Sequence, residues 1–174
     1  MLHRAIQQFL ADVFWGDLDF LFMDLPPGTG DVAISVAQLV PNAELLIVTT
    51  PQAAAAEVAE RAGSITQQTR QRVAGVIENM AAMVLPDGST LDVFGSGGGQ
   101  HVADRLSVLT GGKVPLLGQI PLDPALRVHG DEGTPIAVSA PDSPAGKAVG
   151  EIAAQLMTRR ESLAGKSLGL GVNR

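Results

Sequence analysis

A short run of carboxylates, prolines and glycines at residues 21–31 carries the most chemical information in this sequence. It reads Leu-Phe-Met-Asp-Leu-Pro-Pro-Gly-Thr-Gly-Asp, so that Asp24 follows an apolar stretch and Asp31 closes the run. A carboxylate at the end of a buried strand can meet Mg²⁺ or a bound water. Gly28 and Gly30 let backbone N–H groups approach an anion, because no Cβ stands in the way. The pattern is typical of a nucleotide switch loop with Asp24 and Asp31 as candidate catalytic residues.

The same run also has a purely structural explanation as a turn between a strand and a helix. Pro-Pro-Gly-Thr-Gly is a strong signal for such a turn. Asp31 is a good N-cap for a predicted helix over residues 32–39. For Asp31 we favour the N-cap role slightly over a catalytic one.

Two further motifs stand where predicted strands end. Residues 76–80 read Val-Ile-Glu-Asn-Met, and Asn79 offers both a donor and an acceptor to the edge of a purine. The next predicted strand ends at Pro121, with Asp123 two residues later. Taken alone, Asn79 is more often a turn residue, and Pro-x-Asp is an ordinary exit from a strand.

Together these motifs resemble those of a known family. Asp-Leu-Pro-Pro-Gly-Thr-Gly-Asp resembles the switch II segment of the Mrp/ApbC-type iron–sulfur carrier ATPases, a branch of the MinD/ParA-like P-loop NTPases. Glu-Asn-Met and Ile-Pro-x-Asp are similar to the family's base pocket, and the likeness covers roughly residues 2–160. It implies ATP and Mg²⁺ as cofactors. The residues it implicates are Asp24 for Mg²⁺ through water, Gly28 and Gly30 at the γ-phosphate, and Asn79, Pro121 and Asp123 at the base.

The resemblance also implies ATP hydrolysis in support of iron–sulfur protein maturation, by a homodimer that serves client proteins. The phosphate cradle Gly-x-x-x-x-Gly-Lys-Ser/Thr is absent, however. Residues 164–167 (Ala-Gly-Lys-Ser) mimic its end, but Arg160 stands where the first glycine is required. In the family this cradle precedes switch II. We therefore expect the C-terminal portion of a longer ATPase, inactive by itself.

The family's cluster ligands are absent as well. The family places Cys-x-x-Cys between the Glu-Asn-Met strand and a Phe-Gly-x-Gly-Gly stretch, here residues 94–98. This chain has Met-Val-Leu-Pro-Asp-Gly at residues 83–88 and no cysteine at all. Thiolates are the usual ligands of iron–sulfur clusters. A non-catalytic dimerisation or scaffold fragment, or a MinD/ParA-like positioning ATPase, therefore remains an alternative.

Composition limits the other possibilities. A chain of 174 residues with 45% hydrophobic residues is enough for one domain with a core. A net charge of −6 and few aromatic residues argue against nucleic-acid partners. No run is long enough to span a bilayer and no signal peptide is evident, so we expect a cytoplasmic protein with no membrane partner. His3, His101 and His129 have no partner at metal-ligand or triad spacing.

Helical and strand patterns alternate along the chain. The apolar periodicity predicts helices over residues 2–14, 32–39, 53–70, 100–109 and 146–160, and strands over 18–23, 44–49, 73–79 and 114–120. Thr50 and Pro51 suit the N-cap and first position of the third helix. Repeated strand–helix units predict a doubly wound, mostly parallel α/β sheet like that of P-loop NTPases, incomplete at the N-terminus. We expect one domain over residues 1–160 and a glycine-rich disordered tail over 161–174.

Overall fold

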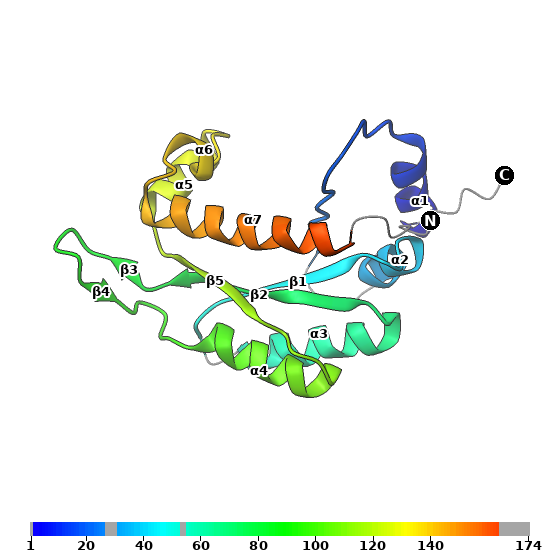
Figure 1. The fold of residues 1–174 in the computed structure, drawn as a ribbon, viewed down its shortest axis with the longest axis horizontal. Helices are drawn as coiled ribbons and strands as arrows, with labels where there is room; N and C mark the ends of the chain where they lie inside the picture. The colour runs from blue at the N-terminus through cyan, green and yellow to red at the C-terminus, as the bar shows by residue number, and fades with distance from the viewer. Residues whose placement is uncertain (1, 27–30, 53–54, 164–174) are drawn as a thin grey trace.

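A parallel sheet with helices on both faces organises the chain (Figure 1). The computed structural model describes residues 2–26, 31–52 and 55–163. In chain order the elements are α1 (Leu2–Asp12), α2 (Asp31–Leu39), β1 (Glu44–Thr49), α3 (Ala55–Thr69), β2 (Arg72–Ala81), β3 (Met83–Val84), β4 (Thr90–Leu91), α4 (Gly98–Thr110), β5 (Leu116–Pro121), α5 (Pro124–Asp131), α6 (Ile136–Ser139) and α7 (Pro144–Leu163).

The sheet has the order β1-β2-β5, and both pairings are parallel. Val48 lies opposite Ile77, and Glu78 lies opposite Gln119. Strands β3 and β4 form a separate antiparallel pair, which projects beyond the end of β2 (Figure 1). All three strands of the main sheet therefore end at the same edge, near which the predicted base-site residues Asn79, Pro121 and Asp123 lie.

Each face of the sheet has its own apolar core. Helices α3 and α4 pack on one face, where Val76 and Leu106 are fully buried. Helix α7 covers the other face, where Ile77 packs with Leu117 and Ile152. Val76 and Ile77 belong to different cores because side chains alternate along a strand. The predicted α/β class with a doubly wound parallel sheet is confirmed.

The largest correction concerns residues 18–23, which were predicted to form a buried strand. In the structure they form no strand, and Leu18 and Phe22 are 50% and 69% exposed. An apolar run becomes a strand only where a neighbour accepts and donates its backbone hydrogen bonds. Within the described residues β1 is an edge strand that pairs with β2 alone. The prediction was wrong because an apolar composition reports a tendency to be buried and not the regular run of backbone hydrogen bonds that defines a strand.

Helix boundaries needed smaller corrections. Residues 51 and 52 form a bend, and α3 begins at Ala55, beyond residues 53 and 54, which lie outside the described residues. The predicted N-cap at Thr50 and helical start at Pro51 are therefore wrong. The carbonyl groups of both residues instead face the start of α4. Helix α1 ends at Asp12, so Phe14, which the prediction included, lies beyond it.

Several elements were missed or extended. Residues 85–91, for which no helix or strand was predicted, contain β4 and the turn of a short hairpin. Helices α5 and α6 follow β5 and were not predicted. Helix α7 continues to Leu163, three residues into the predicted tail, and residues 164–174 lie outside the described residues. No helix in the described part of the chain is long and apolar enough to cross a bilayer.

Candidate nucleotide-binding site

The ends of β2 and β5 bring together the residues predicted to contact a base. The two strands are neighbours in the parallel sheet, and Ala81 lies opposite Pro121. Asn79 precedes Ala81 by two residues, and Asp123 follows Pro121 by two. Ligands of open parallel sheets bind outside the carboxyl ends of the strands. The strand ends thus place Asn79, Pro121 and Asp123 at one edge, as the sequence predicted.

Asn79 makes a local contact that leaves half of its amide for other partners. Its Oδ1 accepts a hydrogen bond from the Met80 backbone N–H at 2.9 Å. Met80 has a φ of 58°, an unusual conformation for a residue with a side chain. Asn79 and Met80 nevertheless lie within β2, which continues to Ala81, two residues beyond the predicted strand end, so the local contact distorts the strand and does not end it. The NH₂ group of Asn79 is the part that could donate to an acceptor on a base.

Asp123 caps a helix. Its Oδ1 accepts from the Ala125 backbone N–H at 2.8 Å, and Pro124 occupies the first turn of α5. An N-cap carboxylate satisfies an otherwise unpaired helix N–H and is stabilised by the helix dipole. The cap holds Asp123 and the preceding Pro121 in a fixed relation to α5.

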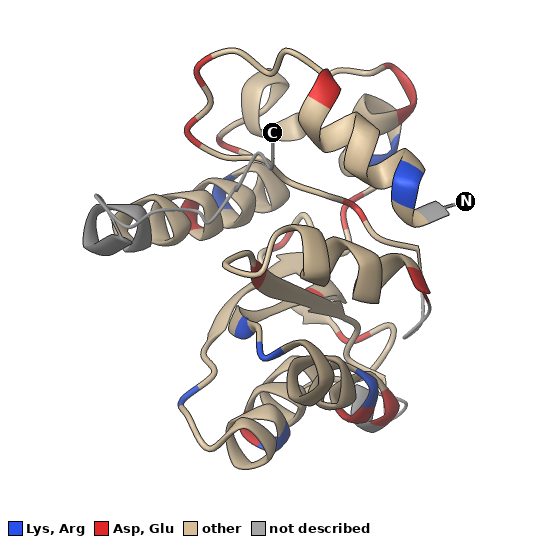
Figure 2. Cartoon of the chain, turned by 90° about the vertical axis from the view of Figure 1, so that its right-hand side faces the viewer, with Lys and Arg blue, Asp and Glu red and all other residues tan. Residues whose placement is uncertain are grey.

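A cavity of about 480 Å³ lies beside these strand ends. Pro121, Gln119 and Glu78 line it from the sheet, and Ser96 and Lys147 line it from the loop before α4 and from α7. Its volume falls within the range of small-molecule pockets. Lys147 is the one basic side chain among its lining residues, beside the acidic Glu78, Asp92 and Glu151. Elsewhere in the described residues lysines and arginines are scattered over several elements (Figure 2).

The predicted switch residues do not join this edge. Asp24 is exposed in the irregular stretch that follows α1. Asp31 is the first residue of α2, which packs against α1 on the side of the molecule away from β3 and β4 (Figure 1). A carboxylate in the first turn of a helix is favourable, close to the predicted N-cap role. Gly28 and Gly30 lie outside the described residues.

The β3–β4 hairpin occupies the place where the resemblance expects Cys-x-x-Cys. Its turn is closed by Asp87, whose Oδ1 accepts from the Ser89 hydroxyl at 2.6 Å and from the Ser89 backbone N–H at 2.9 Å. The hydrogen bond from the Ser89 hydroxyl, and to a smaller extent the one from the Ser89 backbone N–H, lowers the pKa of Asp87 below its usual value of 3.8. No group of three or more His, Cys, Asp or Glu residues among those described could hold a metal ion, and the sequence has no cysteine.

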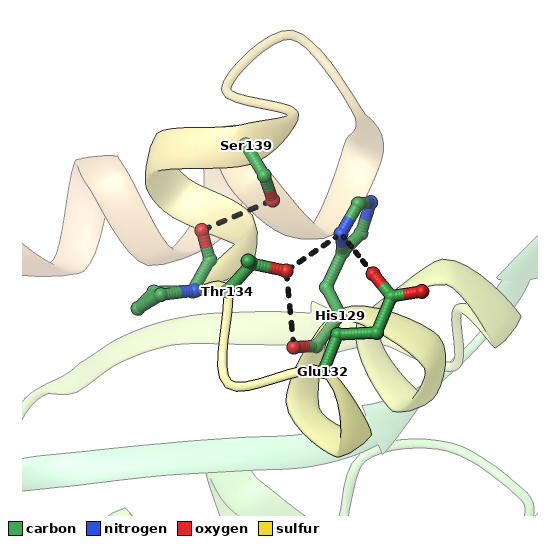
Figure 3. Close-up of polar contacts among 5 residues, drawn as sticks. His129, Glu132, Thr134 and Ser139 are labelled. Carbon is green, nitrogen blue, oxygen red and sulfur yellow. Dashed lines mark hydrogen bonds and ion pairs between the residues drawn. The ribbon is translucent and has the colours of Figure 1, made fainter.

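One histidine belongs to a polar cluster, shown in Figure 3. His129 Nδ1 lies 3.2 Å from Thr134 Oγ1 and 4.0 Å from Glu132 Oε2. Both contacts fall on the same ring nitrogen, so the imidazole cannot relay a proton between them. Thr134 Oγ1 donates to the His129 carbonyl and Ser139 Oγ to the Pro135 carbonyl. These contacts close the connection between α5 and α6, which is a structural role.

Sequence reasoning missed a buried polar pair beneath the site. Glu78 is 1% exposed and shares a hydrogen bond with Gln119. The available signal was a glutamate directly after Val-Ile inside a strand that otherwise reads as apolar. Carboxylates are almost never fully buried without partners.

Comparisons with known proteins match the chain to one family. A family model described as ParA, NUBPL iron-transfer P-loop NTPase, matches residues 1–157. Curated proteins named iron-sulfur cluster carrier protein match the whole chain at 70% identity in Mycobacterium tuberculosis and 68% in Mycobacterium leprae. The chain covers 46% and 45% of those relatives, so it spans about half their length. A third such protein, from Synechocystis, is 45% identical over 90% of this chain and 43% of its own.

Solved structures agree on the architecture. A nucleotide-binding protein from Archaeoglobus fulgidus, solved in complex with ADP, is 36% identical with a TM-score of 0.63, over 76% of this chain and 52% of that chain. The MinD cell division protein of Aquifex aeolicus has a TM-score of 0.60 at 23% identity, over 90% of this chain and 59% of that chain. The second likeness shows the fold alone.

Proposed function

The chain belongs to the ParA family of NUBPL iron-transfer P-loop NTPases, and on that premise we propose that it forms the base-binding part of an iron–sulfur cluster carrier ATPase. The resemblance drawn from the sequence motifs is thereby confirmed at the level of the family. The observation that carries the proposal is the pairing of Ala81 with Pro121, which brings the ends of β2 and β5 together and so places Asn79, two residues before Ala81, on the strand next to Pro121.

The strand-end residues have complementary roles toward a purine. The NH₂ group of Asn79 donates to a ring nitrogen of the base, and Pro121 offers a rigid apolar wall. Asp123 holds the exit of β5 in place through its cap on α5. ADP and ATP carry the same base, so this end of the site distinguishes purine nucleotides from others and not di- from triphosphates.

The phosphate end of the site rests on the switch residues. Asp24 would hold Mg²⁺ through water, and Mg²⁺ would neutralise charge on the phosphates when bound. Gly28 and Gly30 would contact the γ-phosphate, and Asp31 would complete the loop either as a helix-start carboxylate or as a catalytic group. The exposure of Asp24 leaves its oxygens open to solvent and to a hydrated ion.

The iron–sulfur cluster is the cargo of the proposed protein. Its usual ligands are thiolates, and this chain has none. The cluster does not fit the side chains of this chain, and the role proposed here is therefore limited to nucleotide binding. Homodimerisation and delivery to client proteins are proposed for the whole protein.

The proposal is tested with Asn79→Asp in the 174-residue chain. The substitution keeps an oxygen to accept from the Met80 N–H but removes the NH₂ donors. We expect ADP to bind the parent chain weakly, at about millimolar Kd, because base contacts act alone, and the variant to bind about tenfold more weakly.

ADP titration followed by NMR measures both affinities, with Gln68→Glu, an exposed site on α3, as the control. Thermal unfolding should be similar in Asn79→Asp and the parent. Equal ADP affinity in parent and Asn79→Asp would overturn the role of Asn79. An absence of any ADP response in the parent chain would overturn the base site.

A further inference from the structure

Glu78 is the one buried ionisable side chain among the described residues. Its neighbour Asn79 belongs to the proposed base site, but Glu78 points to the opposite face of the sheet, toward α4. A buried carboxylate is costly unless its oxygens are hydrogen-bonded. The ion pairs of the described residues do not include Glu78. Its stabilisation must therefore come from uncharged donors.

Both oxygens of Glu78 have a donor. The Gly99 backbone N–H donates to Oε2 at 2.5 Å, and Gln119 Nε2 donates to Oε1 at 2.6 Å. A backbone amide and a side-chain amide are both uncharged donors, so the two oxygens are satisfied without a cation. Gly99 lies in the first turn of α4, where unpaired N–H groups and the helix dipole favour a negative charge.

Glu78 takes the place of a missing helix cap. The N-cap residue of α4 is Gly97, with a φ of 83° and no side chain that could bond to the helix. Ordinarily an N-cap side chain accepts from the second or third helical N–H. Here the acceptor comes from Glu78, a residue 21 positions earlier in the chain and on a different element. Helix α4 is thus capped by the sheet itself.

The close approach of α4 depends on two adjacent glycines. A Cβ on Gly98 would collide with the Thr50 carbonyl oxygen and lie 2.7 Å from the Pro51 carbonyl oxygen. A Cβ on Gly99 would lie 2.7 Å from Glu78 Cβ. The backbone at the start of α4 therefore packs directly on the carboxyl ends of β1 and β2.

Through these contacts one carboxylate joins α4, β2 and β5. Gln119 lies opposite Glu78 in the sheet register, two residues before Pro121. Asn79 follows Glu78 directly. The register is irregular between Glu78 and Ala81, so the Glu78–Gln119 pair lies directly before the stretch that contains Asn79 and leads to Pro121.

We propose that Glu78 is a positioning residue that fixes Asn79 and Pro121 relative to each other by capping α4 and binding Gln119. The expected effect on ADP affinity rests on the proposed base site. The expected effect of Glu78 on the position of Asn79 does not require a ligand. Glu78 and Gln119 also line the cavity beside the strand ends, which Ser96 of the loop before α4 closes.

The test uses the donor and acceptor pattern of the pair. Glu78→Ala should speed hydrogen exchange of the Gly99 amide about ten- to a hundredfold, since a bond to a charged group is lost. Because that variant leaves a buried hole, a milder one is needed. Gln119→Glu places a second carboxylate, at an exposed position, against the buried carboxylate of Glu78. Adding Glu78→Gln restores the pair, with the amide donor now at residue 78 and the carboxylate acceptor at residue 119.

We expect Gln119→Glu to shift the Asn79 side-chain NMR resonances of the ligand-free chain and to weaken ADP binding about tenfold. The double variant Glu78→Gln/Gln119→Glu should restore both to within about threefold of the parent. Gln68→Glu makes the same chemical change at an exposed site on α3 and is the control. Thermal unfolding of the single and double variants separates a local change at Asn79 from a general loss of stability.

Two results would overturn the inference. One is that the Asn79 side-chain resonances of Gln119→Glu match those of the control Gln68→Glu. The other is that the double variant recovers neither the parent Asn79 resonances nor the parent ADP affinity. If the parent chain shows no ADP response, the proposed base site fails, while the ligand-free Asn79 resonances still decide whether Glu78 positions that residue.

Discussion

Asp87 illustrates at the residue scale how one exposed carboxylate can organise a turn. Both Ser89 donors point at the same oxygen, Oδ1. Donors favour the ionised form, which is why its pKa lies below the usual 3.8. The turn contact is therefore strongest when Asp87 is charged.

We predict that Ser89→Ala raises the pKa of Asp87 toward 3.8, since the hydroxyl is the larger cause of the shift. A carboxylate with a lowered folded pKa contributes stability that is present above its unfolded value and lost as the pH falls through the folded value. The hairpin should therefore loosen only below about pH 3.8. Carboxyl carbon NMR titration of Asp87 measures the change. An unchanged midpoint in Ser89→Ala would show that the hydroxyl has no part in it.

At the scale of elements, the start of α4 tolerates little added volume. It replaces a local cap with a carboxylate from β2 and requires backbone contact with residues 50 and 51. The same contact explains why α3 begins later than its Thr-Pro signal indicates. A tertiary contact of this kind overrides the local preference of the segment.

We predict that Gly98→Ala destabilises the chain by at least about 1–3 kcal/mol, because the added methyl group meets backbone atoms that cannot rotate away. Gly150→Ala in α7 is the matched control, since nothing lies within 4 Å of its would-be Cβ. That control should gain up to about 1 kcal/mol of helix propensity. Urea denaturation measures both, and equal stability of the two variants would contradict the packing described for α4.

At the scale of the whole molecule, the described residues include exposed apolar side chains and an edge strand. Phe14 and Phe22 are 95% and 69% exposed, and β1 is an edge strand whose Val48 is also exposed. Edges of this kind invite pairing with another chain. The exposed residues 18–23 add to the same tendency.

We predict that the isolated chain self-associates, with sedimentation that depends on concentration. Val48→Lys should reduce the association, because a charge on an edge strand opposes pairing. Val108→Lys, at an exposed position on α4, should not. A monomer with a sharp, reversible thermal transition would contradict the prediction.

The isolated chain should also show no ATPase activity. It contains no Gly-x-x-x-x-Gly-Lys-Ser/Thr segment, whose backbone and lysine hold the phosphates in P-loop enzymes. Phosphate release with and without Mg²⁺ measures this directly. Magnesium-dependent ATP hydrolysis by the purified 174-residue chain would show that other groups of this chain hold the phosphates.

Local sequence was enough for elements whose pattern and partners agree. The strand over Glu44–Thr49 was predicted with its observed bounds because an apolar, β-branched run is flanked by turns and has β2 beside it. The position of Asn79, Pro121 and Asp123 near one edge of the sheet was predictable because strand ends of a parallel sheet meet there; their role stays a prediction. Helices α5 and α6 were missed because they are short, and α5 has no buried residue to give an apolar stripe.

The sequence by itself determined the family and the α/β class and indicated candidate residues for a base site, since these depend on motifs and on periodicity along the chain. Only the tertiary structure decided that residues 18–23 are not a strand and that Glu78 caps α4. Both outcomes depend on which groups meet across distant segments. Hydrogen-bond partners of a strand or a buried carboxylate are set by packing, and no local pattern records them.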